Sequence, residues 1–75
     1  MKWLLTSVTM SRESRRRIGK AGVSVVDTTD LHQRGIIRTP NMTVLQVEQW
    51  FEESRSGRET ITKVVDVRPA DGGRR

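Results

Sequence analysis

The feature that most constrains this fold is a helix start at Thr43, which three local signals mark together. Thr43 is a preferred N-cap residue, and Gln46 three positions later completes a capping box. Met42 before the cap and Val47 at the fourth helical position are spaced for a hydrophobic staple. The spacing predicts a helix over residues 44–55.

One face of this predicted helix is apolar and another is acidic. Val44, Val47 and Phe51 recur at helical spacing, with Trp50 at the edge of the stripe. We expect the acidic side chains to face water, namely Glu48, Glu52 and Glu53. Gly57 is expected to supply the left-handed residue that ends the helix.

Several short runs have the composition of β-strands. Residues 2–10 predict a strand whose residues Leu4, Val8 and Met10 share a face. Residues 59–68 predict a strand that ends at Pro69, with one face formed by Ile61, Lys63, Val65 and Val67.

The middle of the chain gives weaker signals. We expect a short strand over residues 23–27, a turn over 28–30 and a short third strand over 34–39. Residues 11–20 are polar and basic, which is typical of a helical turn or a long loop. The Gly-Lys-Ala-Gly run that follows should end whatever structure forms there.

These elements predict one α+β domain: a small antiparallel or mixed sheet of three to four strands, packed by one helix over residues 44–55. We expect the domain to span residues 1–69 and residues 70–75 to be a disordered tail. The chain has 75 residues, of which 33% are hydrophobic. The core should therefore draw on nearly all of the large apolar side chains.

The chain contains no cysteine, which excludes disulfides, thiolate metal sites and cysteine nucleophiles. Secreted domains of this size usually need disulfides, so we expect a cytoplasmic protein. The apolar start is interrupted by Thr6 and Ser7 before a basic run, which does not match a signal peptide. We expect neither a membrane-spanning segment nor a membrane partner.

Charge is distributed unevenly along the chain, with a net charge of +5. Residues 1–40 hold eight Lys or Arg against three acids, whereas residues 41–73 hold four against six. This asymmetry predicts two faces with different partners. The excess positive charge favours polyanions, such as nucleic acid or an acidic protein surface.

The densest charged cluster holds five cations within nine positions and one acid, Glu13. Its cations are Arg12, Arg15, Arg16, Arg17 and Lys20. The planar guanidinium pairs well with carboxylate or phosphate, so the cluster predicts an anion-binding arm. The alternative is a solvated loop that aids solubility.

Arg34 and Arg38, which flank Gly-Ile-Ile, either extend this patch or are the solvent-facing ends of a strand. The three aromatic residues, Trp3, Trp50 and Phe51, are expected in the core. That expectation argues against a base-stacking platform and leaves phosphate-backbone binding open.

No motif indicates catalysis. Serine and threonine are plentiful, but no base and nucleophile occur with an orienting third group, and no glycine-rich phosphate loop is present. Asp27, Asp30 and His32 are close in sequence, yet turn chemistry explains both aspartates. We expect no enzyme activity, metal, cofactor or small-molecule substrate.

Residues 43–69 combine a Thr-Val-Leu…Val-Glu-Gln-Trp helix, a short turn and a closing strand that ends Val-Asp-Val-Arg-Pro. This pattern resembles the small RNA polymerase inhibitors of lytic phages of the T-odd coliphage type. The resemblance implies a phage protein that binds host RNA polymerase and whose last-strand arginines grip the enzyme. Arg68 carries over, whereas Asp66 stands where that family has a second arginine.

That family is acidic, whereas this chain is basic, so the implied contact lies on another patch of the polymerase. The basic arm would then lie near nascent RNA or DNA, as in antitermination factors. The favoured hypothesis is a polymerase-binding transcription regulator, an inhibitor or an antitermination factor, with Arg68 and the basic arm in its contacts. The alternatives are a direct DNA- or RNA-binding protein and a small structural or assembly protein.

Overall fold

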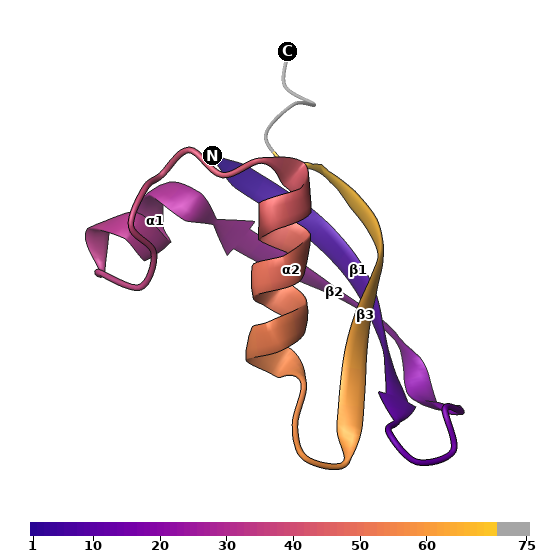
Figure 1. The fold of residues 1–75 in the computed structure, drawn as a ribbon. Helices are drawn as coiled ribbons and strands as arrows, with labels where there is room; N and C mark the ends of the chain where they lie inside the picture. Colours follow the sequence, from indigo (N-terminus) through magenta and orange to yellow (C-terminus); the bar gives the residue numbers. More distant parts are fainter. Residues whose placement is uncertain (71–75) are drawn as a thin grey trace.

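Three antiparallel strands crossed by one long helix form the frame of the fold (Figure 1). The computed structural model describes residues 1–70. Its elements are β1 (Lys2–Ser11), β2 (Arg17–Asp27), α1 (Thr28–Gln33), α2 (Val44–Arg55) and β3 (Thr60–Pro69). The strand order is β2-β1-β3, so β1 is central. The predicted α+β class, with an antiparallel sheet packed by a helix over residues 44–55, is confirmed.

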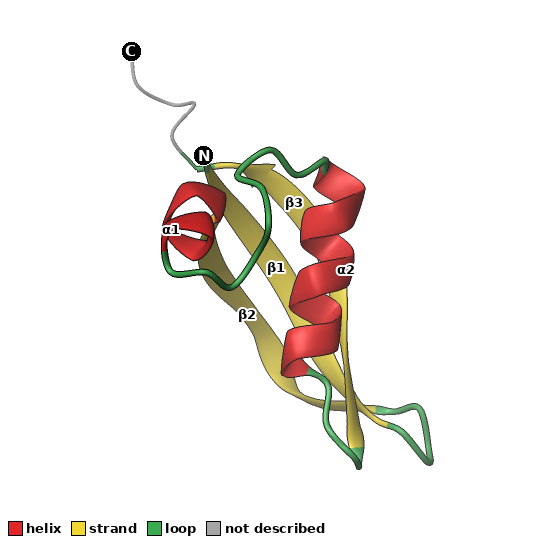
Figure 2. Ribbon diagram, turned by 60° about the vertical axis from the view of Figure 1, so that its left-hand side comes forward, coloured by secondary structure: helices red, strands yellow, loops and turns green. Residues whose placement is uncertain are grey.

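The connection from β2 to β3 crosses β1 on one side of the sheet, and both helices lie on that side (Figure 2). After β3, the backbone N–H of Ala70 donates to the carbonyl of Lys2 at 2.9 Å. The rest of the tail predicted to be disordered, residues 71–75, lies outside the described residues. Neither helix of residues 1–70 has the length and apolar character needed to cross a membrane.

The core is small and lies between α2 and the sheet. Its buried side chains are Trp3, Leu5, Val26, Val47 and Phe51. The predicted core places for Trp3 and Phe51 are confirmed, and Trp50 packs against the cluster while staying partly exposed. The expectation that nearly all large apolar side chains are buried is wrong. Several large apolar side chains of β2, β3 and α2 stay exposed, although none of β1 does.

The capping box at the start of α2 is present as the sequence predicts. The Thr43 hydroxyl accepts a hydrogen bond from the Gln46 backbone N–H at 3.1 Å. The Gln46 side-chain oxygen accepts from the Thr43 backbone N–H at 2.9 Å. The cap starts the helix in the register that turns Val47 and Phe51 toward the sheet, where both are buried.

The end of α2 differs from the prediction. Ser56 caps the helix in an extended conformation, and Gly57 does not have a positive φ. The reason is that the chain leaves the helix directly for β3, and the Ser56 hydroxyl accepts from the Thr62 backbone N–H at 2.9 Å. That bond holds an extended exit, so no left-handed residue is needed.

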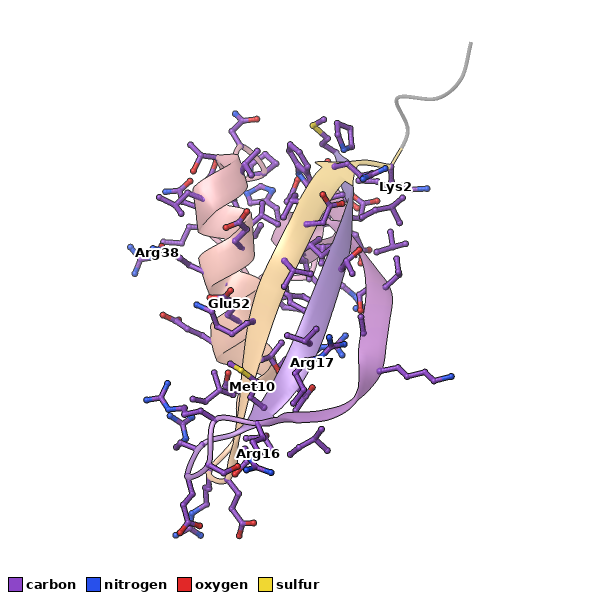
Figure 3. The ribbon with its side chains drawn as sticks, turned by 90° about the vertical axis from the view of Figure 1, so that its right-hand side faces the viewer. Lys2, Met10, Arg16, Arg17, Arg38 and Glu52 are labelled. Carbon is purple, nitrogen blue, oxygen red and sulfur yellow. The ribbon has the colours of Figure 1, made fainter. Side chains whose placement is uncertain are left out.

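Glu52 does not face water, contrary to the prediction. Its carboxylate accepts a hydrogen bond from the backbone N–H of Val64 at 2.8 Å. Figure 3 shows Glu52 on α2 where the helix runs beside β3. Because β3 is an edge strand, its outward N–H groups have no strand partner, and Glu52 satisfies one of them.

The prediction of a loop or helical turn over residues 11–20 is wrong in its second half. β2 begins at Arg17 and continues through both glycines to Asp27. Met10 pairs with Arg17 and Thr9 with Ile18, and the register shifts between Ser7 and Thr9. Pairing with β1 therefore makes residues 17–22 a strand that composition alone does not predict.

The segment after β2 holds two further corrections. Residues 28–30, predicted as a turn, begin the short helix α1, whose N-cap is Asp27. Residues 34–39, predicted as a third strand, form no strand. Gly35 has a φ of 78° there, and the backbone N–H of Ile36 donates to the Leu31 carbonyl at 2.9 Å, which folds the chain back on α1 instead of extending it.

The face predicted for β3 is wrong because the strand contains a bulge. The pairing of β1 with β3 shifts between Thr6 and Ser7, so Val65 has no partner on β1. Val64 and Val67 pack against the core, whereas Val65 is 60% exposed. The alternation read from Ile61 to Val67 therefore breaks at the bulge.

Candidate binding surfaces

The hairpin of β1 and β2 carries the predicted basic arm to one end of the molecule (Figure 1). Ser11 and Arg16 are joined across the loop by a backbone hydrogen bond of 2.9 Å. The Arg15 backbone N–H donates to the Ser11 carbonyl at 2.8 Å, with Arg15 at a φ of 62°. The Ser11 hydroxyl also accepts from the Ser14 backbone N–H at 3.2 Å. These bonds give the arm a defined shape.

Arg12 is the member of the arm whose side chain bonds within the protein. Its guanidinium donates to the Gly57 carbonyl at 2.8 Å and to the Thr60 carbonyl at 3.4 Å. Its backbone N–H donates to the Glu59 carbonyl at 2.9 Å. Arg12 therefore fastens the hairpin to the loop between α2 and β3.

This fastening brings Arg58 to the hairpin, which the sequence did not predict. An open hollow of about 620 Å³ lies between the two segments and is lined by Ser11, Arg12, Glu13, Ile18, Arg58, Glu59 and Thr60. We define the basic tip as the exposed cations of the hairpin loop, the first half of β2 and the loop before β3: Arg15, Arg16, Arg17, Lys20 and Arg58. Figure 3 shows Arg16 by the hairpin loop and Arg17 over the neighbouring part of the sheet.

The cations of the basic tip have no ion-pair partner within residues 1–70. The ion pairs of that part of the chain join the N-terminal ammonium to Asp27, Arg34 to Asp30, and Arg68 to Asp66. All five cations of the tip are exposed. Their charge is therefore available to an external anion.

The structure does not bring Arg34 and Arg38 to the basic tip. Arg34 follows α1, at the opposite end of β2 from the hairpin, and lies 3.8 Å from the carboxylate of Asp30. Arg38 lies beside α2 (Figure 3) and lines a shallow groove with Trp50 and Glu53. The alternative in which Arg34 and Arg38 extend the basic arm is therefore wrong.

Asp27 and Asp30, examined in the sequence as metal ligands, have structural partners. The Asp27 carboxylate accepts from the backbone N–H groups of Thr29 and Asp30 at 3.1 and 3.3 Å. Asp30 pairs with Arg34. No cluster of metal-ligating side chains occurs in the part of the chain that the structure describes.

A second surface, absent from the sequence predictions, is the sheet face opposite α2. No element within residues 1–70 covers this face (Figures 2 and 3). We call it the open sheet face and define its apolar part by the register as Leu4, Val8, Met10, Val23, Val25 and Ile61. Val23 and Val25 are 67% and 60% exposed. Thr6 lies among these residues on the same face. An uncovered surface this rich in apolar side chains indicates a contact with another molecule.

Cations predominate at the rim of the open sheet face. Lys63 pairs with Val8 and Arg68 with Leu4, so both side chains lie on this face. The Arg68 guanidinium contacts the Asp66 carboxylate at 2.9 Å, and its side chain is 68% exposed. The signal for this surface is the consecutive apolar run Trp3-Leu4-Leu5, which makes both faces of β1 apolar.

Comparison with known proteins identifies no relative. The chain matches no family model, and no match was found among curated proteins or solved structures. The fold and the surfaces therefore define its class: a small α+β protein with an uncovered sheet face and a basic hairpin.

Proposed function

We propose that this protein is a small regulatory binding protein that docks on bacterial RNA polymerase and performs no chemistry of its own. It acts in the bacterial cytoplasm, which is the host cytoplasm if a phage encodes it. The observation that carries the proposal is the open sheet face, with its apolar centre and exposed Arg68. Modulation of transcription follows from occupying the enzyme.

The partner is inferred from two features. α2, a short loop and β3 are consecutive elements, as the resemblance to phage polymerase inhibitors implies, and they end at Arg68 and Pro69. The rim cations Lys2, Lys63 and Arg68 outnumber the acids Asp27 and Asp66, which favours an acidic protein surface. The arginine gives such a contact a planar donor that suits carboxylates.

The first test is recovery of tagged protein from a bacterial lysate treated with nuclease, followed by titration of purified RNA polymerase. We expect polymerase subunits at near-stoichiometric yield after nuclease. Recovery that disappears with nuclease would contradict polymerase docking. A transcription assay with the purified enzyme then separates inhibition from antitermination.

The contact surface is tested by Val25→Asp, which places a charge among the apolar side chains of the open sheet face, next to Leu4. We expect an affinity loss of at least about tenfold, because an unpaired carboxylate would be desolvated in the complex. Leu45→Asp is the matched control, since Leu45 is 62% exposed and Val25 60%. Equal losses in both variants would remove the open sheet face from the contact.

Arg68→Ala tests the contribution of this arginine, and Arg34→Ala is a control matched in exposure and in ion pairing. Arg68 and Arg34 have side chains that are 68% and 67% exposed, and each pairs with a nearby aspartate. Only Arg68 lies on the open sheet face. We expect Arg68→Ala to weaken polymerase binding and Arg34→Ala to leave it unchanged.

A further inference from the structure

We propose that the basic tip binds the phosphate backbone of duplex DNA without reading its sequence. This site adjoins the polymerase contact, which uses the apolar side chains of the open sheet face and Arg68. Arg17, which pairs with Met10, lies where the two surfaces meet. The other cations of the tip belong to the hairpin loop, the start of β2 and the loop before β3.

The cations of the basic tip are not neutralised by ion pairs within the described residues. Within residues 1–70, no ion pair involves any of the five cations of the tip. The acids nearby in sequence, Glu13 and Glu59, line the hollow but pair with none of them. A group of exposed like charges repels itself, and a bound polyanion relieves that repulsion.

The backbone that carries the cations of the hairpin loop is ordered before any ligand binds. Hydrogen bonds across the loop fix residues 11–16, and Arg12 fastens this loop to Gly57 and Thr60. A ligand therefore meets cations on a backbone that is already ordered. Less conformational entropy is lost on binding to such a surface than on binding to a flexible arm.

The side chains of the basic tip suit a phosphate backbone better than an acidic protein surface. Protein contacts depend on large anchors, often aromatic, that fill pockets of the partner. No aromatic residue occurs among the cations of the tip. The large apolar side chain between Arg12 and Lys20 is Ile18, which is 50% exposed. A phosphate backbone requires only correctly spaced cations, and that is what the tip presents.

The positions of the aromatic residues favour duplex DNA over a single strand as the ligand of the tip. Proteins that hold single strands stack the bases on exposed aromatic rings. Here Trp3 and Phe51 are buried in the core, and the partly exposed Trp50 lines the groove beside Arg38 and not the hollow at the tip. Duplex DNA carries about one negative charge per 1.7 Å of its axis, a higher charge density than that of a single strand. The β1–β2 hairpin is one edge of the three-stranded sheet, since β1 also pairs with β3 as far as Ser11. Its cations lie on the loop and on β2, where the closely spaced phosphates of a duplex can contact several of them.

The experiment measures binding of the purified chain to a labelled DNA duplex of random sequence over a range of salt concentrations, without polymerase. Five phosphate contacts predict a slope of log affinity against log salt of about −4.5. Arg15→Ala/Arg16→Ala should weaken binding and reduce the slope by about 2. Arg34→Ala/Arg38→Ala removes the same charge away from the tip and should change both quantities much less.

Several outcomes would overturn the proposal. These are equal effects of the two double variants, tighter binding to single-stranded DNA of the same length, and equally tight binding to poly-glutamate. Arg15→Gly/Arg16→Gln, which keeps Arg15's positive φ accessible, should repeat the effect if the alanine variant folds poorly. Val25→Asp should keep DNA binding, so failure of polymerase docking and failure of this site are distinguishable.

Discussion

At the scale of single residues, two charged side chains join segments that are distant in sequence. Arg12 donates to the Gly57 carbonyl across 45 positions, and Glu52 accepts from the Val64 N–H across 12. The pattern of the sequence predicts water for Glu52 and an anionic partner for Arg12. Neither fold contact is predictable from local pattern, because each partner is a backbone group that the tertiary fold supplies.

The candidate site is likewise predictable from the sequence only where its residues are neighbours along the chain. The arm from Arg12 to Lys20 is evident because its cations are neighbours in sequence, and the fold keeps its tip together. Arg58 joins it only through the contact that Arg12 makes with the loop before β3. Arg34 and Arg38 are separated from it because β2 runs the length of the sheet between them and the hairpin.

Replacing Glu52 tests whether its contact with β3 contributes to stability. We expect Glu52→Ala to lower the free energy of unfolding by about 1–2 kcal/mol, because the partly buried Val64 N–H loses its acceptor. Glu53→Ala, next along α2 and exposed, should change it by less than about 0.5 kcal/mol. Urea denaturation measures both, and equal values would mean that the Glu52 hydrogen bond contributes nothing.

At the scale of elements, the predictability of each one depends on where its hydrogen bonds are made. α2 was predicted with its bounds, because its cap and its apolar stripe are local in sequence. β2 was predicted only from residue 23, because residues 17–22 are exposed and become a strand through pairing with β1. The bulge at Val65 likewise arises from pairing between strands and leaves no sequence signal.

The two glycines of β2 give a matched test of the hairpin. Gly19 has a φ of 75°, whereas Gly22 does not have a positive φ, and a Cβ at either would meet nothing within 4 Å. Gly19→Ala should therefore cost about 1–2 kcal/mol of unfolding free energy, from the strain of a left-handed L-residue. Gly22→Ala should be neutral or stabilise by up to about 1 kcal/mol, through lower entropy of the unfolded chain.

Thermal and urea unfolding of these two variants measures the backbone strain that a side chain causes at the positive φ of residue 19. If both alanines destabilise equally, the positive φ at Gly19 is not what the hairpin requires. If Gly19→Ala alone destabilises and also weakens DNA binding, the shape of the hairpin supports the basic tip.

At the scale of the whole molecule, the sheet has two apolar faces and one covering layer. The sequence predicts apolar residues on both sides of β1 but does not predict which side α2 covers. Trp3 and Leu5 lie under the helix, whereas Leu4 and Val8 lie on the open sheet face. The expectation of an all-inclusive core failed for this reason, and the residues left outside it form the candidate docking surface.

The two faces should therefore respond differently to truncation. Phe51 is 1% exposed and belongs to the core, so Phe51→Ala should cost about 3–5 kcal/mol. A domain of this length has a total stability of about 4–11 kcal/mol, so that loss approaches unfolding. Val25, 60% exposed on the other face, should lose less than about 0.5 kcal/mol as Val25→Thr. Urea unfolding at several protein concentrations measures both, and a large, concentration-dependent cost for Val25→Thr would mean that copies of the chain already cover the open sheet face, leaving it unavailable to a polymerase.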